Sequence, residues 1–359
     1  MVAKDLVSMD TDILPKRSRW RLILTIGAFI ALAILIYSLR HQIIDVLKDL
    51  GKVNPFALLL IIPLKLINYD AYTRLYRSLF KTLGSNVGYW PMFKITNELS
   101  FVNYILPSGG VSGVSYFSLR MRKEGVSAAK ATLAQVMKFF LLFVSFQPLL
   151  IIGVLFLAAR GHVNDLVIMV ATSLITLLVV GTFMGVYIIG SRSRINSFLT
   201  FMTRLINRII QVVRRRNPET INIQKAQKAF TELHEDYQIF KNNLGGLKRP
   251  FMFTMVANLM EIATLYVVYI AFGEFVNFGA VILAYAVANF AGLISVLPAG
   301  IGIYEGLMTA VLAATGIPPK LSLPVTIMFR VLTMFIQLPP GYYFYQKALK
   351  KDFQPKLQK

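Results

Sequence analysis

Long uncharged apolar stretches separate the polar parts of this chain. Three of them contain no charged side chain: Leu22–Leu39, Phe139–Ala159 and Leu166–Gly190. A helix of about 20 apolar residues spans the roughly 30 Å hydrocarbon core of a bilayer. The pattern therefore predicts an all-α integral membrane protein.

Two further apolar regions are interrupted by proline and glycine, in "LPSGG" at 106–110 and "LPAG" at 297–300. Both residue types favour turns. Non-helical backbone is tolerated at membrane depth where protein or a water-filled cavity satisfies its polar groups. We therefore expect two re-entrant, broken-helix hairpins, at 107–113 and 298–305, and we expect them to line a polar cavity.

The basic residues predict the orientation in the membrane, because cytoplasmic loops are enriched in Lys and Arg. Five clusters hold 29 of the 38 basic residues, and we place them, with both termini, in the cytoplasm: Lys4–Arg21, Arg74–Lys81, Arg120–Lys130, Arg192–Arg249 and Lys347–Lys359. The expected location is the cytoplasmic membrane of a prokaryote. Six full spans result, at about 20–39, 54–76, 127–159, 165–190, 251–272 and 321–346.

The two interrupted regions match each other at a constant offset of 191 residues. Leu106-Pro107 falls on Leu297-Pro298, Gly109 on Gly300, Gly125 on Gly316, Met137 on Met328 and Pro148 on Pro339. The charge-derived orientation makes the two copies enter from opposite faces, which is the inverted repeat of many secondary transporters. The expected organisation is a tail at 1–19, a first repeat at 20–160, a second repeat at 161–346 and a basic tail at 347–359.

The segment 191–249 within the second repeat is polar and basic. Its apolar residues from Phe198 to Val213 recur at helical spacing, which predicts an amphipathic helix at the membrane surface. A second helical stripe follows from Ala226 to Leu244. The insert either packs on the bundle as a linker or gathers lipid or a partner, and the sequence leaves both alternatives open.

Composition narrows the function. The chain is 56% hydrophobic and 15% charged, with a net charge of +21. In a membrane protein this charge reflects cytoplasmic loops and anionic lipid rather than nucleic acid. Because there is no cysteine and there are only three histidines, we expect no metal, no cofactor and no thiol catalysis.

Ionisable side chains inside apolar segments are the first candidates for a functional site. We expect Lys94 to pair with Glu98 four residues along one helix, Glu305 to pair with Arg330, and Lys138 to meet Glu261 between the repeats. Helix N-termini after Gly110 and Gly302 favour an anion. The candidate substrate-binding residues are Asp70, Lys94, Glu98, Asn103, Pro107, Gly109, Gly110, Lys138, Asn258, Glu261, Asn289, Pro298, Gly300, Gly302, Glu305 and Arg330.

The second half resembles the lysylphosphatidylglycerol synthase transmembrane region, a flippase-like family. The resemblance covers roughly 20–346 and implies movement of lipids between leaflets. In the first half, "PSGGVSG" at 107–113 lacks the Arg and Glu of the commonest family pattern, which points to a different headgroup. The matching positions are Pro298, Gly300, Gly302, Glu305, Gly316, Phe329-Arg330, Pro339 and Gly341.

These observations favour a flippase or scramblase-like transporter over an enzyme. Nothing in the chain is long or polar enough for the synthase domain of the larger family members, and no Walker motif is present. Expected partners are membrane lipids, namely an anionic or aminoacylated phospholipid or a polyprenyl-linked substrate, with no nucleic acid, and homo-oligomer formation stays open. A small-solute or ion transporter and, less favoured, a membrane transferase are the alternatives.

Overall fold

The computed structural model describes residues 40–105, 111–159, 165–191, 243–294 and 302–353, with positions 30, 37, 193–194, 197, 238 and 300. Every regular element in these ranges is helical. The α-helices are α2 (Arg40–Asp49), α3 (Pro55–Leu59), α4 (Ile61–Thr82), α5 (Tyr89–Ile105), α6 (Val111–Arg122), α7 (Ala128–Ala159), α8 (Asp165–Ile189), α11 (Lys248–Ala271), α12 (Phe278–Ile294), α13 (Ile303–Ala314) and α14 (Pro319–Phe353).

Five helical segments in this part of the chain are long and apolar enough to cross a membrane: Pro55–Thr82, Ala128–Ala159, Asp165–Tyr187, Gly245–Ala271 and Pro319–Lys350. They agree with five of the six expected spans. The protein is therefore a multi-pass membrane protein. The remaining expected span, 20–39, lies almost wholly outside the described residues, as does most of the 191–249 insert, whose last residues belong to α11 instead.

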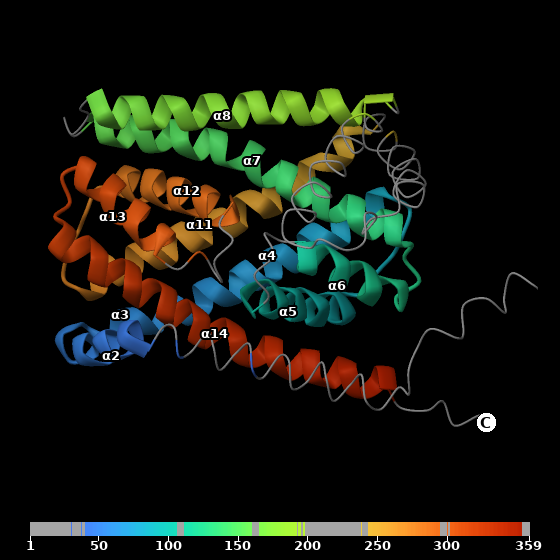
Figure 1. Cartoon of the computed structure of the whole chain (residues 1–359), viewed down its shortest axis with the longest axis horizontal. Coiled ribbons are helices and arrows are strands. Elements are labelled where there is room, and N and C mark those ends of the chain that lie inside the picture. Colours follow the sequence, from blue (N-terminus) through green and yellow to red (C-terminus); the bar gives the residue numbers. More distant parts are fainter. Residues whose placement is uncertain are drawn as a thin grey trace, which may run out of the picture.

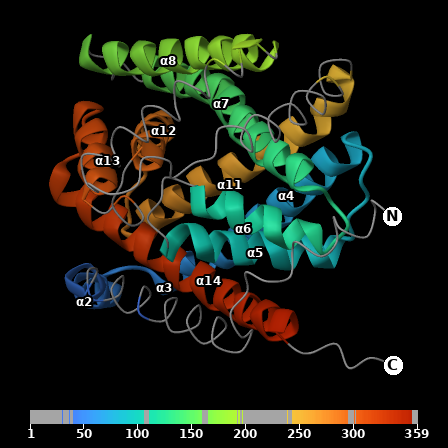
Figure 2. The ribbon, with the colours of Figure 1, turned by 45° about the vertical axis from the view of Figure 1, so that its right-hand side comes forward.

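Helices α4 and α11 pack against each other through the middle of the molecule (Figures 1 and 2). Two further pairs flank them, α5 with α6 and α12 with α13. We call these the first and second interrupted pairs, because the sequence predicts a turn between the two helices of each. α5 packs on α14, and α12 packs on α7, so each pair leans on a long helix from the other half of the chain. α8 lies beside α7 at the outer edge, where Leu177 and Phe183 are 62% and 71% exposed. Such apolar exposure suits a lipid-facing surface.

The helix order repeats at the offset seen in the sequence. α7 begins at Ala128 and α14 at Pro319, which are 191 positions apart. The turn before each is the same: Gly125 has φ 77° and Gly316 has φ 89°. A left-handed residue that ends a helix is usually glycine because it lacks a Cβ. The first interrupted pair is thus connected to α7 by the same kind of turn that connects the second pair to α14.

Hydrogen bonds across these two glycines also correspond position by position. The Val126 N–H donates to the Met121 carbonyl at 3.1 Å, and the Ile317 N–H donates to the Leu312 carbonyl at 2.9 Å. Both bonds close the last turn of a helix. This local chemistry is shared by the two halves even though few side chains match.

The interrupted helices end and restart where the sequence predicts. α5 ends at Ile105 and α6 begins at Val111, whereas α12 ends at Ile294 and α13 begins at Ile303. The expected turns themselves, with Pro107, Gly109, Gly110 and Pro298, lie outside the described residues. α5 and α6 run antiparallel, because Glu98 reaches both Tyr116 and Arg120.

Candidate functional site

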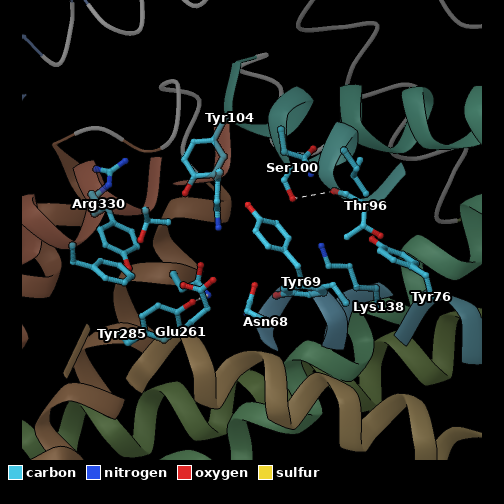
Figure 3. Close-up of a pocket in the computed structure, with 18 residues that line it drawn as sticks. Asn68, Tyr69, Tyr76, Thr96, Ser100, Tyr104, Lys138, Glu261, Tyr285 and Arg330 are labelled. Atoms are coloured by element: carbon cyan, nitrogen blue, oxygen red, sulfur yellow. Dashed lines mark hydrogen bonds between the residues drawn. The ribbon is translucent and has the colours of Figure 1, made fainter. Parts of the chain in front are cut away.

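A cavity of about 330 Å³ opens between the central helix pair and the two interrupted pairs. Its lining is drawn from seven helices, and Figure 3 shows it between α4, α5 and α14. Most of the side chains that line it carry a polar group. The residues lining it are Asn68, Tyr69, Tyr72, Tyr76, Thr96, Leu99, Ser100, Asn103, Tyr104, Lys138, Glu261, Tyr285, Asn289, Tyr304, Phe329, Arg330, Thr333 and Gln337.

Tyrosine is the commonest residue of this lining, with six members. Tyr69, Tyr72 and Tyr76 share one face of α4, since they are spaced three and four apart. The Tyr76 hydroxyl donates to the Gln135 side chain at 3.1 Å. The sequence analysis missed the tyrosines because it followed formal charges. The signal was present as spacing in "NYDAYTRLY" (68–76).

Arg330 on α14 contacts the carboxylate of Glu305 on α13, which confirms the expected pair. Glu305 also accepts the Gly302 N–H at 2.7 Å and the Gln42 amide at 3.4 Å. A carboxylate at the first turn of a helix satisfies a backbone donor and favours the positive end of the helix dipole. Glu305 therefore caps the N-terminus of α13 and also positions Arg330 at the cavity. The Arg330 guanidinium lies 4.9 Å from the centre of the Tyr304 ring.

The expected contact between Lys138 and Glu261 is wrong. Glu261 instead accepts from Lys65 Nζ at 2.6 Å, and Lys65 is fully buried. The reason is packing: Lys65 lies on α4, which α11 contacts directly along its length. The two charges join the central helices at the base of the cavity, and Glu261 presents its remaining surface to it.

Lys138 on α7 lies in the lining without a carboxylate partner among the described residues. Its Nζ lies 5.2 Å from the centres of the Tyr72 and Phe139 rings. In Figure 3 Lys138 lies beside Tyr69, whereas Arg330 lies across the cavity from both. The site thus has a positive group on either side.

The expected Lys94–Glu98 pair is also wrong. Glu98 accepts from Arg120 on α6 at 2.6 and 3.1 Å and from Tyr116 at 2.7 Å, whereas Lys94 is exposed. α6 returns antiparallel against α5, so it brings Arg120 nearer to the carboxylate than a neighbour on α5 itself. Glu98 fastens the first interrupted pair outside the cavity lining.

Several other candidate residues from the sequence make structural contacts outside the cavity lining. Asp70 accepts from Arg74 and from Tyr89, at 2.7 Å each, on a partly exposed surface. Asn258 donates to Ser145 at 2.7 Å and so joins α11 to α7. Gly300 and Gly302 have φ 67° and 85° beside α13. Five of the expected residues line the cavity: Asn103, Lys138, Glu261, Asn289 and Arg330.

The profile of the lysylphosphatidylglycerol synthase transmembrane region matches residues 23–341. The chain belongs to this family. The residues that carry the resemblance, from Gly300 and Glu305 to Arg330, are those that start α13 and close one side of the cavity.

Relatives of this lysylphosphatidylglycerol synthase transmembrane-region protein occur in archaea. A UPF0104 membrane protein of Methanocaldococcus jannaschii is 22% identical over 335 residues, which are 91% of this chain and 94% of that relative. One from Methanothermobacter thermautotrophicus is 19% identical over 321 residues, 88% of this chain and 91% of the relative. Another from that organism is 31% identical over 103 residues, which cover 29% of this chain and 31% of the relative.

Proposed function

We propose that this protein moves a lipid headgroup between the leaflets of a membrane, as a flippase or scramblase-like transporter. The headgroup enters the tyrosine-lined cavity while the acyl chains stay in the surrounding lipid. The observation that carries the proposal is the cavity itself, because polar space with paired and unpaired charges inside a multi-pass bundle is costly unless it serves a pathway.

The volume fits this role. A volume of about 330 Å³ lies near the lower end of the range for ligand pockets. Such a space holds a headgroup but not the acyl chains attached to it. The family match supports a lipid substrate, since its description refers to a lipid-modifying synthase.

The arrangement of the helices supports a two-sided route. We infer that the two interrupted pairs are re-entrant hairpins of an inverted repeat that approach the cavity from opposite faces. The contacts of α5 with α14 and of α12 with α7 support a cavity at the interface of the two repeats. In transporters with inverted repeats the substrate site lies at this interface, and rocking of one half exposes it to either side.

The proposal is tested by a leaflet-exposure assay in proteoliposomes that contain a fluorescent phospholipid. Arg330→Ala and Glu305→Gln should slow lipid movement by about tenfold or more, because each breaks the contact that positions the guanidinium at the cavity. Arg74→Ala and Asp70→Asn remove a comparable ion pair at the partly exposed surface and should leave the rate unchanged.

If both cavity variants moved lipid as fast as the parent protein, the assignment of the pathway would be wrong. A parent protein that moved no lipid at all would remove the transport proposal itself. Uptake of a free small anion into the same vesicles, without lipid movement, would favour a small-solute transporter, for which the modest cavity volume also has room.

A further inference from the structure

We propose that the cavity selects a headgroup of the phosphodiester class with one net negative charge, and that Lys138 sets this selectivity. The inference rests on the proposed function, because it concerns the same cavity and names its substrate class. The inference states which headgroup the cavity accepts, whereas the proposed function states that a headgroup is moved between leaflets.

The charge balance of the lining is the first argument. Glu261 is neutralised by Lys65 at 2.6 Å, and Arg330 is in contact with Glu305. Each of these pairs is electrically neutral as a unit. Among the lining residues that the structure describes, this leaves the ammonium of Lys138 as the charge without a counter-ion. Lys138 is partly buried, and a partly desolvated charge without a partner is stabilised by a counter-ion, so the site favours an anion in the cavity.

The hydrogen-bonding groups of the lining point to the same class. The Tyr69 and Thr333 hydroxyls are buried and have no hydrogen-bond partner among the described residues. Both side chains are 4% exposed and both line the cavity. Buried hydroxyls are expected to find a partner. The non-ester oxygens of a phosphodiester accept hydrogen bonds and carry a negative charge, so a headgroup of this class offers acceptors for such hydroxyls and a counter-charge for Lys138.

A cationic headgroup fits the cavity poorly. It would need a free carboxylate, but both carboxylates at the cavity are already held by basic side chains. Aromatic rings offer a second way to bind a cation. Two of the ring faces are taken, because Lys138 lies over Tyr72 and Arg330 lies over Tyr304. The lining therefore favours an anionic headgroup over a zwitterionic or aminoacylated one.

Binding is measured on the full chain in detergent, by thermal shift and by titration with short-chain lipids. Dihexanoyl-phosphatidylglycerol should bind about tenfold more tightly than dihexanoyl-phosphatidylcholine. Both lipids offer the same phosphodiester, but the choline cation of phosphatidylcholine is repelled by Lys138 and finds no free carboxylate in the lining. Lys138→Gln should abolish this preference and Lys138→Arg should retain it. Lys94→Gln, which removes an exposed lysine of the same charge outside the lining, should leave the preference intact.

Equal binding of the two lipids by the parent protein, or a preference that survives Lys138→Gln, would overturn the inference. Inorganic phosphate is the third probe. If it competes with dihexanoyl-phosphatidylglycerol only weakly, the cavity binds the headgroup as part of a lipid. If it binds as tightly as the lipid and does so through Lys138, the anion site stands but its source is a free phosphate, and the lipid assignment falls.

The two proposals fail separately. A chain that binds phosphatidylglycerol through Lys138 but moves no lipid in vesicles would keep the anion site and remove transport. A chain that moves phosphatidylglycerol and phosphatidylcholine at equal rates, with Lys138→Gln unchanged, would keep transport and remove the selectivity.

Discussion

At the scale of single residues, each of the three buried carboxylates in the described part of the chain, Glu98, Glu261 and Glu305, is paired with a basic side chain from another helix. Lys65 and Glu261 are the most enclosed example, with 0% and 9% of their surfaces exposed. Lys65 Nζ also lies 5.5 Å from the centre of the Phe329 ring. Removing one member of such a pair leaves the other uncompensated in a medium of low polarity.

Lys65→Met should therefore lower the stability of the folded protein by about 3–5 kcal/mol. The double variant Lys65→Met/Glu261→Leu should recover most of this loss, because two apolar side chains can replace a buried ion pair with little cost. Thermal unfolding in detergent measures both, and Lys94→Met at an exposed position serves as the control. A double variant no more stable than the single one would contradict the pairing.

The residue scale also shows what the sequence could predict. Glu305 and Arg330 were identifiable as partners because the elements that carry them follow one another in the chain. Glu261 was assigned to the wrong lysine, because its partner depends on α4 lying against α11, which no local pattern reports. The tyrosines of α4 recur at helical spacing in the sequence, but they carry no charge, and the prediction of site residues relied on charged side chains.

At the scale of elements, glycines let the interrupted pairs approach the long helices of the other half. A Cβ on Gly341 of α14 would lie 2.7 Å from the Phe101 Cβ and 2.8 Å from the Asn97 carbonyl oxygen on α5. The corresponding contact joins α12 to α7, where a Cβ on Gly153 would lie 3.2 Å from the Ile282 side chain and 3.3 Å from the Gly279 carbonyl oxygen. Small residues allow this backbone proximity in membrane helices.

Gly341→Ala should destabilise the protein by about 1–3 kcal/mol, because the added methyl group forces α14 away from α5. Gly185→Ala is the matched control: it lies in α8, where a Cβ would meet nothing within 4 Å. The control should be neutral or slightly stabilising, since alanine is the better helix former. Equal melting temperatures for the two variants would contradict the close approach.

Element boundaries were predicted well where they depend on local chemistry. Gly125 and Gly316 end α6 and α13 because glycine adopts positive φ readily. The pairing of α5 with α14, and of α12 with α7, was not predictable in the same way. It arises from contacts between residues far apart in the chain, such as Asn97 and Gly341, and hydropathy contains no information about them.

At the scale of the whole molecule, the connection between α6 and α7 and the connection between α13 and α14 lie at opposite ends (Figures 1 and 2). These connections correspond at the offset of 191 residues. In an inverted repeat that spans a bilayer, one of them faces the cytoplasm and the other faces outward. The distribution of basic residues predicts that the first faces the cytoplasm.

The complete absence of cysteine makes this orientation directly measurable. Lys123→Cys and Lys320→Cys, both at exposed positions, introduce a thiol at either connection. In intact cells an impermeant maleimide should label Lys320→Cys and leave Lys123→Cys unlabelled until the membrane is opened. Labelling of both from the same side would show that the two halves are not inverted.

Because α5 packs on α14 and α12 packs on α7, each half of the chain depends on the other for part of its packing. This affects the order in which the protein can assemble during synthesis. α7 leaves the ribosome more than a hundred residues before α12, the helix that covers it. Throughout that interval its glycine-bearing surface meets lipid or a chaperone instead of protein. The first half can form the contacts within itself, but those that α5 makes with α14 and α7 makes with α12 must wait for the second half. Assembly of this protein is therefore completed only after its C-terminal helices have been inserted.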